Sequence, residues 1–253
     1  MKNRAPLTTL LALSLLVMSA WITPTAKAAD LTITLAPGEE VTIPLRLWCL
    51  DYGKPFPTAL GAPGPRAQDE VVAVLQTAIA KGTVVTEIYQ TELAIWLVPT
   101  GKFNDFAKQG TTLAEEIYAE SIKQTVAAIP ESTLTLDEAV ADGSLTYEIL
   151  DFGPSTESLA PAVAAATPFF GTADLVVRNP TDKAVKFLFP EGTVFPPAGG
   201  QNAQNLLSHQ DPLKSAILPA SGAPTRTALS ALFLAAGLFL TGWTIRRSRL
   251  NAN

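Results

Sequence analysis

Cysteine and histidine are the scarcest reactive residues in this chain, with one of each among 253 residues. A single cysteine, Cys49, cannot form an intramolecular disulfide, and one cysteine with one histidine offers too few ligands for a zinc site. We therefore expect no metal and no cofactor. A lone cysteine in an exported protein can be reactive, can pair with another chain, or can be a buried and inert thiol. The histidine, His209, lies beside a proposed linker, so we expect it to be exposed; a Cys49–His209 nucleophile–base pair is a further alternative.

Basic residues are scarce in the central part of the chain. Residues 30–214 hold all 23 acidic residues but only 11 of the 18 basic ones, which leaves this part with a net charge of −12. An acidic domain repels phosphate backbones, so we expect no nucleic-acid partner. The glycine-rich loops that cradle nucleotide phosphates are also missing from the sequence.

The N-terminus has the pattern of a secretory signal peptide, which we assign to residues 1–28. A short basic start precedes an apolar stretch at residues 7–22, and small residues then flank a position that fits the cleavage rule. We expect cleavage between Ala28 and Ala29. An uncleaved anchor helix is the alternative.

The C-terminus has the pattern of a membrane anchor. Residues 227–246 form an apolar run of nearly the length that spans a hydrocarbon core, and the tail at residues 247–253 is basic. Because basic residues favour the cytoplasmic side, we expect the tail inside and the acidic domain on the extracellular face of the membrane.

A short motif precedes this run, within a linker that we place at residues 211–226. It reads Leu218, Pro219, Ala220, Ser221 and Gly222. The order of this motif, an apolar helix and a basic tail resembles the sortase sorting signal of Gram-positive bacteria, Leu-Pro-x-Thr-Gly, with Ser221 in place of threonine. The resemblance implies that a sortase cuts the chain after Ser221 and joins it to the cell wall or to another surface protein. A plain single-pass anchor is the alternative.

The body of the chain, residues 29–210, predicts one extracellular domain of the α+β class, β-rich with a helical middle section. Alternation of apolar residues and turn signals predict strands at residues 31–35, 41–48, 145–151, 173–177, 184–189 and 193–195. Helical periodicity and capping signals predict helices at residues 69–80, 87–98 and 111–128, with a strand as the alternative for the second.

The stretch at residues 47–57 stands out within this body. Cys49 comes at the end of the second predicted strand, and Asp51, Tyr52, Gly53, Lys54 and Pro55 follow at once with turn chemistry. A cysteine where a strand ends and a loop begins is positioned differently from one in the middle of a core strand.

Three short patches together resemble the thioester domains of bacterial surface adhesins. The first is Trp48, Cys49, Leu50 and Asp51, which matches aromatic-Cys-aliphatic-polar. The second is Thr91, Glu92, Leu93, Ala94, Ile95 and Trp96, which matches Thr-Gln-x-Ala-aliphatic-Trp with Glu92 where the family usually has glutamine. The third is Ala203, Gln204, Asn205, Leu206 and Leu207, which matches aliphatic-Gln-x-x-aliphatic, with Gln201 nearby as an alternative glutamine.

The resemblance implies an internal thioester between Cys49 and Gln204, formed with loss of ammonia. It implies that Trp48, Asp51, Thr91, Glu92 and Trp96 shape the pocket around this bond. Its partner would be an amine on a surface protein, which ends bound as an amide after a single turnover, so we expect attachment and not enzymatic activity. The alternative is a non-covalent binding or structural module of the cell envelope with an inert buried cysteine. An envelope hydrolase is a third alternative, for which the sequence nominates no substrate.

Overall fold

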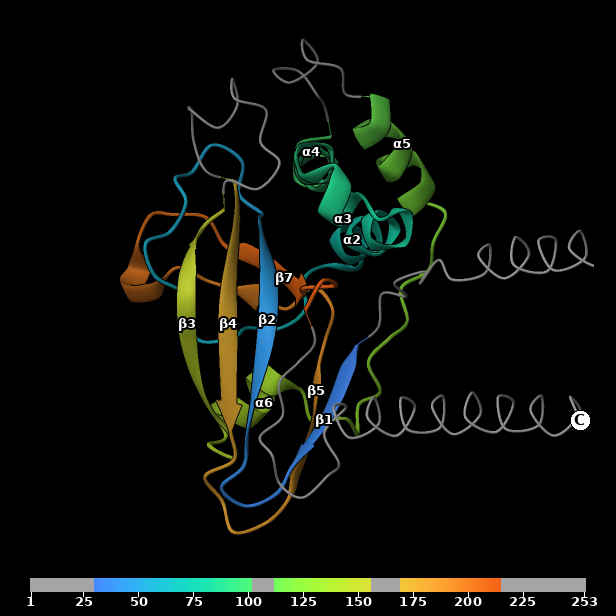
Figure 1. The fold of residues 1–253 in the computed structure, drawn as a ribbon. Coiled ribbons are helices and arrows are strands. Elements are labelled where there is room, and N and C mark those ends of the chain that lie inside the picture. Colours follow the sequence, from blue (N-terminus) through green and yellow to red (C-terminus); the bar gives the residue numbers. More distant parts are fainter. Residues whose placement is uncertain (1–29, 102–111, 156–168, 215–253) are drawn as a thin grey trace, which may run out of the picture.

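The computed structural model describes residues 30–101, 112–155 and 169–214, and these form a mixed α+β fold (Figure 1). An antiparallel half-barrel sheet lies on one side, and the helices of the middle section form a group beside one end of it. The predicted fold class is therefore confirmed at this level. The signal peptide at residues 1–28, the sorting motif at residues 218–222, the apolar run at residues 227–246 and the basic tail all lie outside the described residues.

The main sheet has five antiparallel strands in the order β3-β4-β2-β7-β6. Their bounds are β2 Glu40–Cys49, β3 Thr146–Pro154, β4 Phe170–Arg178, β6 Val194–Phe195 and β7 Leu206–Gln210. Strand β2 is central, and seven consecutive side chains at its end are buried. Near-continuous burial is typical of a strand covered on both faces, and it places the Cys49 end of β2 inside the molecule.

A second, two-stranded sheet pairs β1, Leu31–Leu35, with β5, Val185–Phe189. Asn179 stabilises the turns between the two sheets, because its side-chain amide donates to the carbonyls of Leu35, Ala36 and Lys183. The strands predicted from alternation are all present, with bounds that differ by a few residues.

The helical group contains α2, Asp69–Lys81, α3, Thr83–Thr86, α4, Ile88–Thr100, and α5, Thr112–Ser121. Helices α2 and α4 end at Gly82 and Gly101, whose positive φ angles of 74° and 62° favour glycine. The buried stretch that could have been a strand or a helix is the helix α4. Within the described ranges, no helix is both long enough and apolar enough to cross a membrane.

Helix α5 ends at Ser121, so the prediction that it continues to residue 128 is wrong. The following segment instead makes contacts with α2: the Gln124 amide donates to the Thr77 hydroxyl at 2.8 Å, and Val126 packs on Val72. The sequence pattern allows helical turns up to residue 128, but these tertiary contacts hold the segment after Ser121 in a non-helical conformation.

Several elements were not predicted from the sequence, among them helix α3, helix α6 and strand β7. Helix α6, Leu136–Ala141, follows Thr135, whose backbone N–H donates to the Glu138 carboxylate at 2.9 Å. The Thr-x-x-Glu spacing is a capping-box signal that sequence reasoning could have used. Strand β7 was also missed, although it forms the ladder beside Cys49.

Candidate functional site at the end of the central strand

Cys49 is the last residue of β2, and its side chain is fully buried. Its backbone N–H donates to the carbonyl of Phe169 at 3.2 Å, and the next N–H, of Leu50, donates to the carbonyl of Asn205 at 2.9 Å. On the other side, Cys49 pairs with Leu206, the first residue of β7. The thiol is therefore held where three separate segments of the chain meet.

Gln204 lies two residues before this partner of Cys49, and its side chain is fixed by the loop that follows the cysteine. Its backbone N–H donates to the carbonyl of Pro55 at 3.0 Å, and its side-chain Nε2 donates to the carbonyl of Lys54 at 2.7 Å. The residue is only 2% exposed, and its Oε1 has no hydrogen-bond partner in the described structure. The third sequence motif therefore comes to the same end of the sheet as the first.

The alternative glutamine, Gln201, lies at the surface. Its Oε1 accepts hydrogen bonds from the backbone N–H of Thr58 at 3.4 Å and from the Thr58 hydroxyl at 3.0 Å. An exposed side chain engaged with another loop is less suited than Gln204 to meet a buried thiol.

Asp51 joins the cysteine loop to the Gln204 segment. One oxygen of its carboxylate accepts from both the backbone N–H and the side-chain amide of Asn205, each at 2.8 Å. Its other oxygen lies 3.5 Å from the ammonium group of Lys54. Asp51 therefore acts as a brace between the first and third motifs, and it is not among the described residues that line the cavity near Gln204.

The second motif lies on α4, with both of its polar residues buried. The Thr91 hydroxyl donates to the Thr83 hydroxyl at 3.0 Å, which holds α4 against α3. The neighbouring Glu92 is fully buried, and neither of its carboxylate oxygens makes a hydrogen bond of good geometry to the described residues. A carboxyl group in this condition is costly unless it is neutral.

The thiol and this carboxyl group affect each other. Burial raises the pKa of Cys49 far above its usual value, and the nearby carboxyl groups of Glu92 and Asp51 raise it further. Burial also raises the pKa of Glu92 well above its usual value, while the Cys49 backbone N–H, which faces the carboxylate, opposes part of this rise. Both shifts favour the protonated forms of the two groups.

A cavity of about 460 Å³ opens beside this cluster. It is lined by Tyr52, Gly53, Lys54, Pro55, Trp96, Phe169 and Gln204. The rings of Tyr52 and Trp96 meet edge to face at a centroid distance of 5.2 Å, and Trp96 meets Phe169 in the same manner at 6.1 Å. Tyr52 is 44% exposed, so this aromatic row begins at the surface, and the buried Gln204 lines the same cavity.

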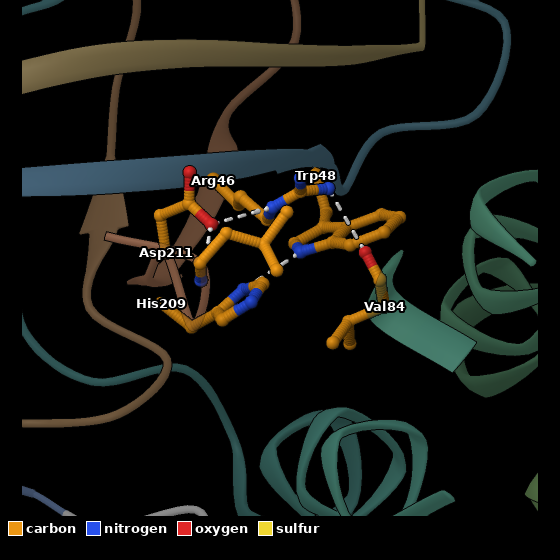
Figure 2. Close-up of polar contacts among 6 residues, drawn as sticks. Arg46, Trp48, Val84, His209 and Asp211 are labelled. Carbon is orange, nitrogen blue, oxygen red and sulfur yellow. Dashed lines mark hydrogen bonds and ion pairs between the residues drawn. The ribbon is translucent and has the colours of Figure 1, made fainter. Parts of the chain in front are cut away.

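Trp48, which the sequence places in the first motif, is not among the described residues that line this cavity. Side chains alternate across a strand, so Trp48 points to the face of β2 opposite Cys49. There its indole N–H donates to His209 Nδ1 at 3.0 Å, as Figure 2 shows. Trp48 therefore anchors the sheet and does not cover the thiol directly.

The same face holds a buried ion pair. Arg46 Nε donates to the Asp211 carboxylate at 3.1 Å, and Arg46 Nη1 donates to the carbonyl of Val84 in α3 at 3.0 Å (Figure 2). This network ties β2, the end of β7 and the helical group together. An arginine within the otherwise apolar stretch at residues 43–49 is the sequence signal that could have revealed it.

The expectation that His209 is exposed is wrong, because the side chain is only 2% exposed. Burial, with Arg46 nearby, lowers the pKa of His209 to about 3, and the opposing effect of Asp211 is smaller. His209 pairs with Arg46 in the β2–β7 ladder, three residues from Cys49 and on the opposite face. This placement speaks against a Cys49–His209 nucleophile–base pair.

The sequence did not single out Phe169 or the carbonyls of Lys54 and Pro55. Phe169 follows a stretch outside the described residues and carries no local motif, and backbone carbonyls leave no signal in a side-chain pattern. Within the described ranges, no three His, Cys, Asp or Glu side chains are grouped so that they could hold a metal ion.

Comparisons of the chain with family models, with curated proteins and with solved structures found no match. The chemistry of the site therefore has to be inferred from its own residues and geometry.

Proposed function

We propose that this chain is a cell-surface attachment protein that binds amines covalently through an internal thioester between Cys49 and Gln204. The observation that carries the proposal is the placement of Gln204. Its amide nitrogen donates to the carbonyl of Lys54, in the loop after Cys49, and its chain enters β7 at the residue that pairs with Cys49.

The bond would form in one exchange. The Cys49 sulfur attacks the side-chain carbonyl carbon of Gln204, a C–S bond forms, the C–N bond breaks, and the nitrogen leaves as ammonia. A primary amine on the target later attacks the same carbon, which forms an amide and frees the thiol. The protein supplies the electrophile and reacts once, so it is consumed and not regenerated.

Burial supports this chemistry, because a thioester must be kept from water until its target arrives. Cys49 and Gln204 are both buried, and the aromatic row of Tyr52, Trp96 and Phe169 gives the approach an apolar wall. The cavity of about 460 Å³ is within the range of small-molecule sites and can admit an alkyl amine or a side chain that carries one.

We propose in addition that the protein is exported and tethered at the cell surface. A signal peptide at residues 1–28, the motif at residues 218–222 and an apolar run at residues 227–246 would export the domain and tether it on the extracellular face, with a sortase as the processing partner. The test is extraction of cell envelopes with detergent: a sortase product stays with the cell wall, whereas a simple membrane span dissolves.

The thioester is tested by the intact mass of the purified full-length chain. The expected mass is lower than the sequence mass, after any signal-peptide loss, by one ammonia, and methylamine should raise it by one methylamine. Gln204→Ala should show no deficit, and Gln201→Ala, the matched control, should behave as the wild type. A wild-type chain at full mass with a free thiol after denaturation contradicts the proposal.

The second candidate is a non-covalent binding module with an inert thiol. Full burial of Cys49 and the raised pKa of its thiol favour this reading equally, because such a thiol is unreactive when no thioester forms. The mass measurement separates the two candidates, since only the thioester removes an ammonia.

A further inference from the structure

Glu92 has a position that the proposed thioester does not by itself explain. It lies in α4, fully buried, with its carboxylate facing the backbone N–H of Cys49. Neither oxygen makes a hydrogen bond of good geometry to the described residues. Buried polar groups in native proteins nearly always have partners, so an unpartnered carboxyl group beside the only cysteine points to a role in its chemistry.

The reaction at Cys49 requires proton transfer. The thiol has to lose its proton as sulfur attacks, and the leaving nitrogen has to gain one. Because burial raises the pKa of Cys49 far above its usual value, a thiolate formed in advance is not available. A second group must therefore move the proton during the attack.

The other titratable groups near Cys49 are poorly placed for this task. His209 lies on the opposite face of β2, and its Nδ1 accepts from Trp48. Asp51 is occupied by Asn205 and Lys54. Among the described residues, Glu92 is the titratable group that faces Cys49 without a hydrogen bond of good geometry to either oxygen.

We propose that Glu92, as a neutral carboxylic acid, relays the protons of thioester formation and of amine attack; this inference rests on the proposed function. During formation its carbonyl oxygen takes the thiol proton of Cys49, and its hydroxyl gives a proton to the departing nitrogen of Gln204. Ammonia leaves and Glu92 ends as a neutral acid. During attack by an amine, Glu92 takes one proton from the amine nitrogen and gives one to the sulfur as the C–S bond breaks.

The relay depends on the functional group of a carboxylic acid. Such a group carries a donor and an acceptor, and exchanging their roles returns it to the same structure. An amide also carries a donor and an acceptor, but the same exchange would leave it as a high-energy imidic acid. A glutamine at position 92 could therefore not relay protons in this way.

The test compares Glu92→Gln, which keeps the shape and loses the relay, with Glu92→Asp, which keeps the carboxyl group and loses length. Glu116→Gln, on the exposed face of α5, is the matched control. Each full-length chain is checked for folding by its melting temperature, its ammonia deficit is measured by intact mass, and the rate of reaction with methylamine is followed.

The relay predicts that Glu92→Gln is folded but forms the thioester, or reacts with methylamine, about 100-fold more slowly than the wild type. Glu92→Asp should be faster than Glu92→Gln, and Glu116→Gln should match the wild type. If Glu92 serves only to fill space, Glu92→Gln will equal the wild type and Glu92→Asp will be slower, and that order overturns the relay while the thioester stands. A wild-type chain without the ammonia deficit overturns both.

Discussion

The side-chain nitrogen of Gln204 donates to the backbone carbonyl of Lys54 at 2.7 Å, although the two residues are 150 positions apart in the chain. Lys54 belongs to the loop that begins at Cys49, so this bond holds the third sequence motif against the first. It also presents the Gln204 amide with its nitrogen engaged by a carbonyl and its Oε1 without a partner. We therefore expect any change to this amide to alter the surroundings of Cys49.

Gln204→Glu is predicted to abolish the thioester while keeping the size of the side chain. A carboxylic acid has no ammonia to release, and its new oxygen would face the Lys54 carbonyl, which accepts and cannot donate. The expected chain has its full mass, and its thiol reacts with iodoacetamide only after denaturation because Cys49 is buried. An ammonia-deficient mass in Gln204→Glu would show that a different glutamine forms the bond.

Arg46→Met is predicted to destabilise the fold by about 3–5 kcal/mol, since it leaves the Asp211 carboxylate buried without its ion partner. The carbonyl of Val84 would lose its donor as well. The measurement is urea unfolding at neutral pH. Arg178→Met is the control: Arg178 and Glu40 form a largely exposed ion pair, whose loss should destabilise the fold far less. Equal losses in the two variants would contradict the structural role of the buried pair.

Much of the fold could be predicted from the sequence because its elements carry local signals. Alternation marked β1 and β2, and Gly82 and Gly101 marked the ends of α2 and α4. The end of α5 and the existence of β7 could not be predicted in this way. Both depend on partners distant in the chain: Gln124 on Thr77, and β7 on β2.

The candidate site was predictable only in part, for the same reason. The three motifs named Cys49, Glu92 and Gln204, and the structure brings these residues to one end of β2. The role of Trp48 was less visible, because the sequence cannot show that its ring points to the opposite face and toward His209. Likewise, nothing local to His209 reveals that Arg46 and Asp211 enclose it.

Gly171→Ala is predicted to destabilise the sheet by about 1–3 kcal/mol through overpacking. Gly171 lies in β4 opposite Leu47, and a Cβ there would come within 2.6 Å of the Phe56 ring and 2.7 Å of the Gly153 carbonyl. Phe56 could yield only by breaking its stack on Phe152, whose ring centroid lies 5.6 Å away. Gly153→Ala, where a Cβ meets nothing within 4 Å, is the control and should have a much smaller effect on the melting temperature.

Stability at acid pH is predicted to depend on His209. Its pKa falls from 6.5 to about 3 on folding, so between these pH values the unfolded chain binds more protons at this residue than the folded one. The contribution of His209 to the free energy of unfolding therefore rises with pH from about 3 to 6.5 and is constant above that range. The measurement is the urea midpoint at pH 4 and at pH 7. The increase in midpoint between these pH values should be smaller in His209→Gln than in the wild type. If the variant and the wild type show the same difference in urea midpoint between pH 4 and pH 7, the pKa of His209 does not fall on folding.

Glu92 is predicted to act on stability in the opposite direction. Its pKa in the fold is well above the usual 4.5, so above pH 4.5 the unfolded chain releases a proton that the folded chain keeps. The contribution of Glu92 to the free energy of unfolding therefore falls as the pH rises from 4.5 toward its folded pKa. Glu92→Gln, which cannot ionise, should remove this fall and become more stable relative to the wild type as the pH increases, whereas Glu116→Gln should not. The measurement is the difference in urea midpoint between variant and wild type across neutral and alkaline pH. A constant difference would mean that Glu92 ionises as easily in the folded chain as in the unfolded one, and a neutral relay at Cys49 would then be impossible.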